Sequence, residues 1–404
     1  MNEFLSGWAE AGKTAAGFFW KAGWAFVLGY SVSAAIQAFV PKKRLTRYMG
    51  DPDAKSISLS TLFGAISSSC SFAALATARS LLVKGAHFVA AVAFMFASTN
   101  LVIELGILIV IFLGWKFLAA EIIGGLILIT ISAVLIRLTY PKKWMEEARK
   151  IAEEGAETEE EDFDWKQRMR SAFGWRLVGH RFVGEWKMVW EEISIGFAVA
   201  GFVAVLVPQW FWEKLFLVGV DAPQWLIALE NAAVAPFVAA ATFIGSMGNI
   251  PLATVLHANG VLFAGIMGFI YSDLMVPPLV AVNAKYYGWR VALYIAGVMF
   301  VSIVITALTL NGLFALLGFL PEGPGKEVGE ITQFAIDYTF WFNLAFVVLA
   351  GVMIFLHRNH MKKDREQDGG MDHGGWTAKR VVALTAIGIV AIGGVLYIAG
   401  FGAG

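Results

Sequence analysis

Residues 56–104 decide how the chain folds, and they read SISLSTLFGAISSSCSFAALATARSLLVKGAHFVAAVAFMFASTNLVIE. The stretch is apolar and long enough for a membrane, but polar residues interrupt it twice. The first interruption is Ser67-Ser68-Ser69-Cys70-Ser71, and the second is Ser98-Thr99-Asn100, followed by Glu104. Backbone groups freed from a helix find no water inside a bilayer, so broken helices survive there only where they are buried in protein or line a polar cavity. The stretch therefore marks either a substrate site or a close helix-packing seam.

The composition of the whole chain indicates a membrane protein. Of its 404 residues, 58% are hydrophobic and 15% are charged, against about a quarter charged in soluble domains. The formal net charge is zero, which gives no overall attraction to nucleic acid. One cysteine excludes an internal disulfide and a multi-cysteine metal site, and no HExxH pair is present, so we expect no metal and no cofactor. We predict an all-α polytopic protein of the cell inner (plasma) membrane.

Basic residues set the predicted orientation of the first half. The first apolar run, 17–40, ends in Pro41-Lys42-Lys43-Arg44, which the positive-inside rule places in the cytoplasm. Three apolar stretches follow: 57–83, 86–114 and 117–139. The hydrophilic segment 140–188 comes next, and its basic flanks again indicate the cytoplasm. Because three stretches join two cytoplasmic ends, one must enter and leave on the same side, and we predict that 57–83 is a re-entrant hairpin.

The second half is predicted to repeat this plan upside down. Its apolar stretches are 189–218, 223–257, 261–284, 291–320, 334–356 and 378–401. The middle of 223–257 holds Gly245, Ser246, Gly248, Asn249 and Pro251, which predicts a second hairpin. Short identities pair the halves: Leu75-Ala76-Thr77 with Leu252-Ala253-Thr254, Gly85 with Gly260 after a two-residue gap, Phe94 with Phe269, and Ser98 opposite Asp273. This is the inverted-repeat plan of secondary transporters, whose hairpin tips and broken helices meet near the bilayer midplane.

The predicted organisation has four segments. They are a first membrane repeat at 1–139, a cytoplasmic loop at 140–188, a second, inverted repeat at 189–320 and two additional membrane helices in 321–404. Together they give about eight transmembrane helices plus two re-entrant helical hairpins, with both termini outside.

Polar residues at the predicted tips and breaks form a candidate substrate site. Hairpin tips present helix N-terminal amides, which favour an anionic or polar solute. The candidates are Ser68, Ser69, Cys70, Ser71, Asn100, Ser246, Gly248 and Asn249. The alternative is structural, because small polar residues let membrane helices approach closely and a cysteine is often an inert small side chain.

Two carboxylates inside apolar stretches are candidate ion-coupling groups. Glu104 lies just past the Ser98-Thr99-Asn100 break, and Asp273 lies at the corresponding break of the second half. Intramembrane carboxylates are costly and usually functional, and desolvation favours a protonated form that can bind and release protons. The alternative is again structural, with Asp273 capping the segment before Pro277-Pro278 and Glu104 facing a packed polar neighbour.

Two groups of motifs resemble a known family. The first comprises Ser69-Cys70-Ser71, Leu75-Ala76, Gly85-Ala86, Ala91 to Phe94 and Ala97-Ser98-x-Asn100, and the second comprises Pro251-Leu252-Ala253, Gly260 and Ser272. They resemble the signatures of the predicted-permease family that contains YraQ and the ArsP organoarsenical efflux permeases. The resemblance implies a membrane permease, and efflux of trivalent organoarsenicals is the activity known in the family. The family often has Cys-Ser-Cys and then a proline, whereas this chain has Cys70 alone, and one thiolate cannot fill both exchangeable positions of a monosubstituted arsenic(III).

We therefore predict a secondary permease that moves a small polar or anionic solute, such as an arsenical or another oxyanion-like species, by alternating access. Coupling to an ion gradient is expected because no Walker A loop is present. The alternatives are a polytopic membrane enzyme, an assembly subunit of a membrane complex, or a channel. An enzyme should show a catalytic constellation, and Cys70 has no histidine at an evident partner position, so no catalytic residue is predicted. The expected partners are a small-molecule substrate and the lipid bilayer but no nucleic acid, and a homo-oligomer stays open.

Overall fold

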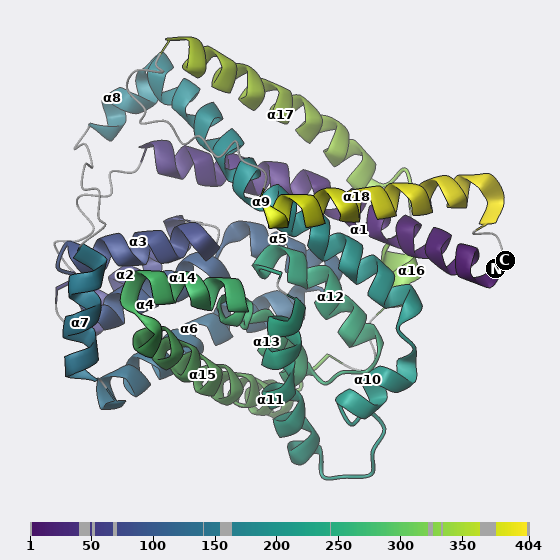
Figure 1. Ribbon diagram of the computed structural model, residues 1–404, viewed down its shortest axis with the longest axis horizontal. Helices are drawn as coiled ribbons and strands as arrows, with labels where there is room; N and C mark the ends of the chain where they lie inside the picture. Colours follow the sequence, from purple (N-terminus) through teal and green to yellow (C-terminus); the bar gives the residue numbers. More distant parts are fainter. Residues whose placement is uncertain are drawn as a thin grey trace. The chain divides into compact units, whose positions relative to one another are not determined.

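The computed structural model is helical, as predicted. It describes residues 2–39, 49–50, 53–67, 71–139, 141–153, 164–242, 244–321, 326–332, 334–363 and 377–401. No β-strand occurs among these residues (Figure 1). The candidates Ser68, Ser69 and Cys70 lie outside the described residues.

Within these ranges, seven helices are long and apolar enough to cross a membrane. They are α1 (Asn2–Phe39), α6 (Trp115–Thr139), α9 (Ala172–Leu206), α11 (Gln224–Thr242), α15 (Trp289–Leu316), α17 (Tyr338–Lys363) and α18 (Ala378–Leu396). An eighth crossing results if α4 (Phe88–Asn100) and α5 (Ile103–Phe112), which meet at a bend of 42°, count as one broken span. This confirms the predicted polytopic membrane protein.

The remaining apolar helices are shorter. They are α2 (Ala54–Ser67), α3 (Ser71–Val83), α12 (Ser246–Ala258), α13 (Phe263–Ile270) and α14 (Pro277–Tyr287), with the 3₁₀ turn η3 (Asp273–Met275) before α14. A helix of 13 residues, such as α3 or α12, is about 20 Å long, whereas the hydrocarbon core is about 30 Å thick. The predicted hairpin segment 57–83 covers all of α3 and all but the first turn of α2, and 223–257 covers α11 and all but the last residue of α12. By length and composition alone α11 could also cross on its own.

Packing divides the chain into two compact units, each built from separated segments. The first unit contains 1–41, 161–207 and 326–404, and the second contains 42–160 and 208–325. These units group helices by contact, whereas the four predicted segments follow chain order, and the predicted repeat boundaries stay predictions.

In the first unit, α1 packs along α9, and both also contact α17 and α18. Ion pairs join these helices at Lys21–Asp337 (2.7 Å), Lys379–Glu192 (2.6 Å) and Arg380–Glu191 (3.3 Å). The hydrogen bond from Lys21 holds the pKa of Asp337 below its usual value. Small residues allow the backbones to approach, because a Cβ on Gly201 of α9 would lie 2.6 Å from the Ala15 backbone nitrogen of α1. Close contact through small residues is the usual way that membrane helices pack.

Gly201→Ala is expected to destabilise the first unit. The added methyl group meets Ala15 backbone atoms that cannot rotate away, and overpacking of this kind costs about 1–3 kcal/mol. Gly184→Ala is the matched control on the same helix, since a Cβ there meets nothing within 4 Å. Thermal unfolding of the purified variants in detergent measures both. Equal melting temperatures for the two variants would contradict the proposed close contact of α1 and α9.

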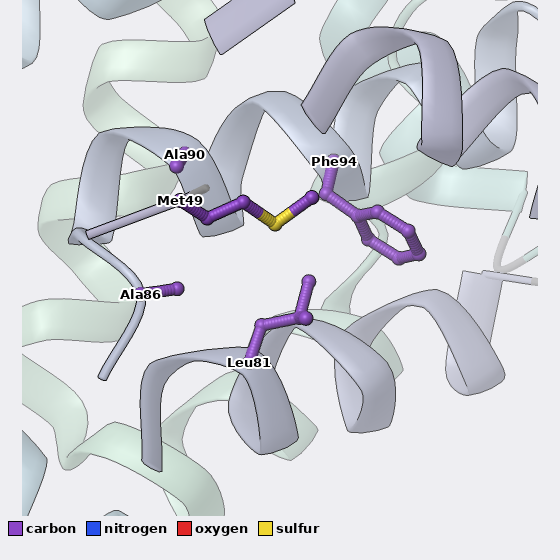
Figure 2. Packing of buried hydrophobic residues seen from close by; sticks show 5 residues of the cluster. All are labelled: Met49, Leu81, Ala86, Ala90 and Phe94. Atoms are coloured by element: carbon purple, nitrogen blue, oxygen red, sulfur yellow. The ribbon is translucent and has the colours of Figure 1, made fainter. Parts of the chain in front are cut away.

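In the second unit, every residue of α4 and of α13 is buried. Helices that are hydrophobic on all sides belong in the interior. Helices α2 and α3 pack on α4, and α11 and α12 pack on α13. Figure 2 shows the side chains of Met49 and Leu81 reaching toward Phe94 of α4, in a buried cluster beside the connection from α3 to α4.

The connection from α3 to α4 has the same geometry as the connection from α12 to α13. Gly85 and Gly260 have φ values of +96° and +84°, which favour glycine at the end of a helix. The start of α3 (Ser71) and the start of α12 (Ser246) are separated by the same 175 positions as these two glycines. At this constant spacing Leu75 pairs with Ile250, not with Leu252. The predicted pairing of Leu75 with Leu252 requires a two-residue gap that this constant spacing does not need, and the alignment of the two halves stays a prediction.

Candidate functional site

Three polar side chains from separate elements of the second unit converge at one point. Ser71 begins α3, Ser246 begins α12, and their hydroxyl oxygens lie 3.4 Å apart. The Ser71 hydroxyl also donates to Oδ2 of Asp273, the first residue of η3, at 3.4 Å. Asp273 is fully buried. These three residues were predicted on separate grounds, Ser71 and Ser246 as solute ligands and Asp273 as a coupling group, and the structure brings them together.

This group combines two helix N-termini with one carboxylate. The first amides of a helix lack intrahelical acceptors, and the helix dipole adds partial positive charge at the same end. Two such ends, at Ser71 and Ser246, therefore favour a negative charge between them. In this structure the Asp273 carboxyl group lies beside Ser71, where that charge is favoured.

The polar residues at the end of α4 bond mainly to their own helix. Ser98 Oγ donates to the Met95 carbonyl at 3.1 Å, and Asn100 Nδ2 donates to the Phe96 carbonyl at 3.1 Å. Such bonds are typical of short polar side chains near a helix end. Asn100 is buried, and its Oδ1 atom has no hydrogen-bond partner among the residues that the structure describes.

Asn249 holds the connection between α11 and α12. Its Nδ2 donates to the Ile244 carbonyl at 3.2 Å, and its Oδ1 accepts from the Thr242 hydroxyl at 3.2 Å. The neighbouring Gly248 is buried in the first turn of α12, and its N–H donates to the Gly245 carbonyl at 3.1 Å. The structure thus gives Asn249 a local structural role at the tip of the predicted hairpin.

Asn249→Leu is expected to lower the stability of the fold. The substitution leaves the buried Ile244 carbonyl without this donor, at a cost of about 1–3 kcal/mol, whereas the Thr242 hydroxyl keeps its bond to the Ala239 carbonyl at 2.7 Å. Thermal unfolding and the yield of monodisperse protein measure the effect, with Thr309→Leu on the exposed face of α15 as control. A melting temperature equal to that of the wild type would refute the structural role.

Glu104 lies in the first turn of α5 and is buried. A carboxylate in the first turn is favoured by the helix dipole. Helix α5 packs against α12, the helix that begins at Ser246. The second coupling candidate therefore belongs to an element next to the Ser71–Ser246–Asp273 group.

Comparison with known proteins identifies the family. The family model described as "Predicted permease" (ArsP_1) matches residues 7–312. The chain belongs to this permease family. A protein of Mycobacterium tuberculosis (strain ATCC 25618 / H37Rv) named "Putative permease Rv2963" is 36% identical to it over 327 residues, covering 78% of this chain and 79% of that protein. No solved structure matches the chain significantly. Membership in the family indicates a membrane transporter in place of the enzyme kept as an alternative.

The permease contains a further buried carboxylate, Glu121, which is not among the residues predicted from the sequence. Glu121 lies on α6 and is 1% exposed. Tyr271, just before η3, is fully buried, and its hydroxyl donates to the Ala120 carbonyl at 3.0 Å. The signal for Glu121 was present, because it is the one charged residue in the interior of the apolar stretch 117–139 before Arg137. No feature of the sequence around Tyr271 predicts that its hydroxyl contacts α6.

Proposed function

We propose that this permease moves a small polar or anionic solute by alternating access and couples the movement to a proton gradient. The observation that carries the proposal is the convergence of Ser71, Ser246 and Asp273, where two helix N-termini meet a buried carboxyl group. An arsenical or another oxyanion-like species fits this chemistry because it offers oxygen atoms to hydroxyl and amide donors.

The charge balance of this group supplies a route to coupling. An ionised Asp273 occupies the position that the two helix ends favour for an anion, and it repels a second negative charge. Protonation of Asp273 removes that repulsion while the serine hydroxyls and helix ends stay in place. Binding of an anionic solute and binding of a proton therefore favour each other, which is the thermodynamic requirement for coupled transport.

Contacts at the ends of segment 57–83 support a re-entrant hairpin there. Met49, shortly before the segment, accepts a hydrogen bond from the His87 N–H, shortly after it, at 2.7 Å. Arg79 near the end of α3 donates to the Ala152 carbonyl at 2.9 Å, so the segment that follows α6 docks at the same place. Entry and exit of the segment thus lie together, beside the basic region that we place in the cytoplasm.

The segment 223–257 has a corresponding arrangement. Asn231 Nδ2 donates to the Phe216 carbonyl, before the segment, at 2.7 Å. Its Oδ1 accepts from the Leu262 N–H, after the segment, at 3.0 Å. One buried side chain therefore connects entry and exit, which favours a hairpin over a single crossing of α11.

Matching contacts in the two halves support an inverted repeat. Helix α3 packs on α14, and its counterpart α12 packs on α5. The counterparts Ser71 and Ser246 contact each other, as residues on a pseudo-twofold axis must. The hairpin tips then meet at the axis, which is where carriers with this plan bind their solutes. We place the protein in the inner membrane, with the central loop 140–188 in the cytoplasm.

Uptake into inside-out vesicles tests the proposed function, because these vesicles take up a solute that the cell would export. Vesicles with and without the permease are screened with a trivalent organoarsenical, arsenite, sulfite, thiosulfate and small carboxylates. Because solute and proton are proposed to bind together, we expect at least one solute to show saturable uptake that an imposed acid-outside gradient drives and that a protonophore abolishes. Uptake that rises linearly with solute concentration and ignores the protonophore would instead indicate a channel.

A further inference from the structure

Glu121 is the buried charged group of the second unit that the proposed site does not yet use. Glu121 is only 1% exposed, and neither oxygen of its carboxyl group has a hydrogen-bond partner among the residues that the structure describes. An ionised carboxylate in such a place is strongly disfavoured unless a cation or a donor reaches it. Glu121 is therefore suited to carry a proton.

The turn of α6 that holds Glu121 lies between the two broken helices. A Cβ on Gly125 would meet the side chain of Leu101, which lies between α4 and α5. A Cβ on Gly124 would meet the hydroxyl of Tyr271, which lies between α13 and η3. Both glycines thus let α6 approach the breaks at which the coupling candidates were predicted.

Tyr271 fixes the position of this turn relative to Asp273. Its hydroxyl donates to the Ala120 carbonyl at 3.0 Å and lies 3.3 Å from the Glu121 carbonyl oxygen. Asp273 follows Tyr271 by two residues, and the charges of the Glu121 and Asp273 carboxylates repel each other. The two carboxyl groups therefore belong to one electrostatic site.

The other helices around this turn bring few titratable groups to it. Helix α6 packs on α4, α5 and α15. Helix α4 has no charged residue, α5 has Glu104, and α15 has Arg290 and Tyr294 at its start. Tyr294 contacts Thr139, at the opposite end of α6 from Glu121. His257 of α12 also approaches α6, because its ring packs 5.1 Å from that of Phe117, one turn before Glu121. Asp273, Tyr271, Glu104 and His257 are thus the groups around Glu121 in this part of the chain.

We propose that Glu121 and Asp273 form an acid pair that holds one proton between them, with Glu121 as the second proton-carrying residue of the coupling site. Two buried carboxylates that repel each other cannot both ionise, so one keeps a proton. The Ser71 hydroxyl and the helix ends favour ionised Asp273, which leaves the proton on Glu121. A second proton, taken from bulk water by an Asp273 oxygen, neutralises the pair, and its return to water restores the negative charge. This inference rests on the proposed function.

Infrared difference spectroscopy tests the pair without any solute. The wild type, reconstituted in lipid bilayers, is titrated with pH while the carbonyl stretch of protonated carboxylic acids is recorded. Glu121→Gln should remove a band that persists at neutral pH in the wild type. In Asp273→Asn that band should remain, but its midpoint should move to lower pH, because the neighbouring negative charge is gone. Glu146→Gln, on the exposed face of α7 (Lys142–Glu153), should change neither the band nor its midpoint.

Two results would overturn the acid pair. One is a wild-type spectrum with no titrating carboxylic acid that depends on Glu121. The other is a midpoint that is the same with and without Asp273, as for an isolated structural glutamic acid. If Glu121→Gln does not fold, the comparison of Asp273→Asn with the wild type still decides the question.

A transport assay then separates this inference from the proposed function. With a solute that the wild type accumulates, Glu121→Gln should lose proton-driven accumulation and keep solute exchange. Normal accumulation by Glu121→Gln would overturn its coupling role while leaving the permease proposal intact. Failure of the wild type to accumulate any solute would contradict the proposed function itself, and the infrared result would be unaffected.

Discussion

Asparagine in place of Asp273 is expected to stop proton-driven accumulation while solute exchange across the membrane continues. Asparagine keeps the shape of the side chain and its ability to accept from Ser71, but it cannot ionise. The side chain at position 273 then stays neutral at every pH. Solute still binds, but its binding no longer depends on the uptake of a proton. Accumulation and counterflow are measured in the same vesicles, with the exposed Asp221→Asn as the matched control.

Glu104→Gln is the parallel variant for the other carboxylate named from the sequence. At least one of the two substitutions should separate accumulation from exchange, because a proton-coupled carrier needs a group that changes charge during the cycle. If both variants accumulate solute as well as the wild type, neither carboxylate couples transport, and a structural role is the correct interpretation.

Leucine in place of Ser71 is expected to abolish both accumulation and exchange. The larger side chain fills the space beside Ser246 and removes the hydroxyl that donates to Asp273. The solute therefore loses both a hydrogen-bond donor and the space in which it would bind. Vesicle transport is compared with Ser58→Leu, which changes an exposed serine on α2 in the same way. Ser71→Ala removes the hydroxyl without adding bulk and should weaken transport less.

The result that would contradict the role of Ser71 is specific. It is transport at the wild-type rate by Ser71→Leu protein whose unchanged elution volume and melting temperature show that it is folded. Loss of folded protein would instead show that the α3 start tolerates no larger residue, and Ser71→Ala would then carry the test.

The sequence predicted those parts of the fold that depend on hydrophobic length and on helix breaks. Apolar runs of membrane length became long helices, and the polar run that ends at Asn100 marks the end of α4. Asp273 likewise begins a 3₁₀ turn between two helices. These features are local, because a helix ends where its own residues offer competing hydrogen bonds or break the backbone ladder.

Other features depend on contacts that no local pattern specifies. Asn249 and Ser246 look equally polar in the sequence, yet one bonds to its own turn and the other meets Ser71. Tyr271 matters because α6 has a glycine opposite it, and that contact joins residues about 150 positions apart. The grouping of α1, α9, α17 and α18 into one unit likewise joins distant segments, so chain order alone could not predict it.

Proton movement driven by solute is the most direct test of the claim that solute and proton meet at Ser71, Ser246 and Asp273. Purified permease is reconstituted into vesicles that contain a pH-sensitive dye, and the solute identified in the uptake screen is added outside without an imposed proton gradient. We expect a change of internal pH with the wild type and none with Asp273→Asn, although that variant still exchanges solute. Solute entry through the wild type with no change of internal pH, or an equal change with Asp273→Asn, would contradict this claim.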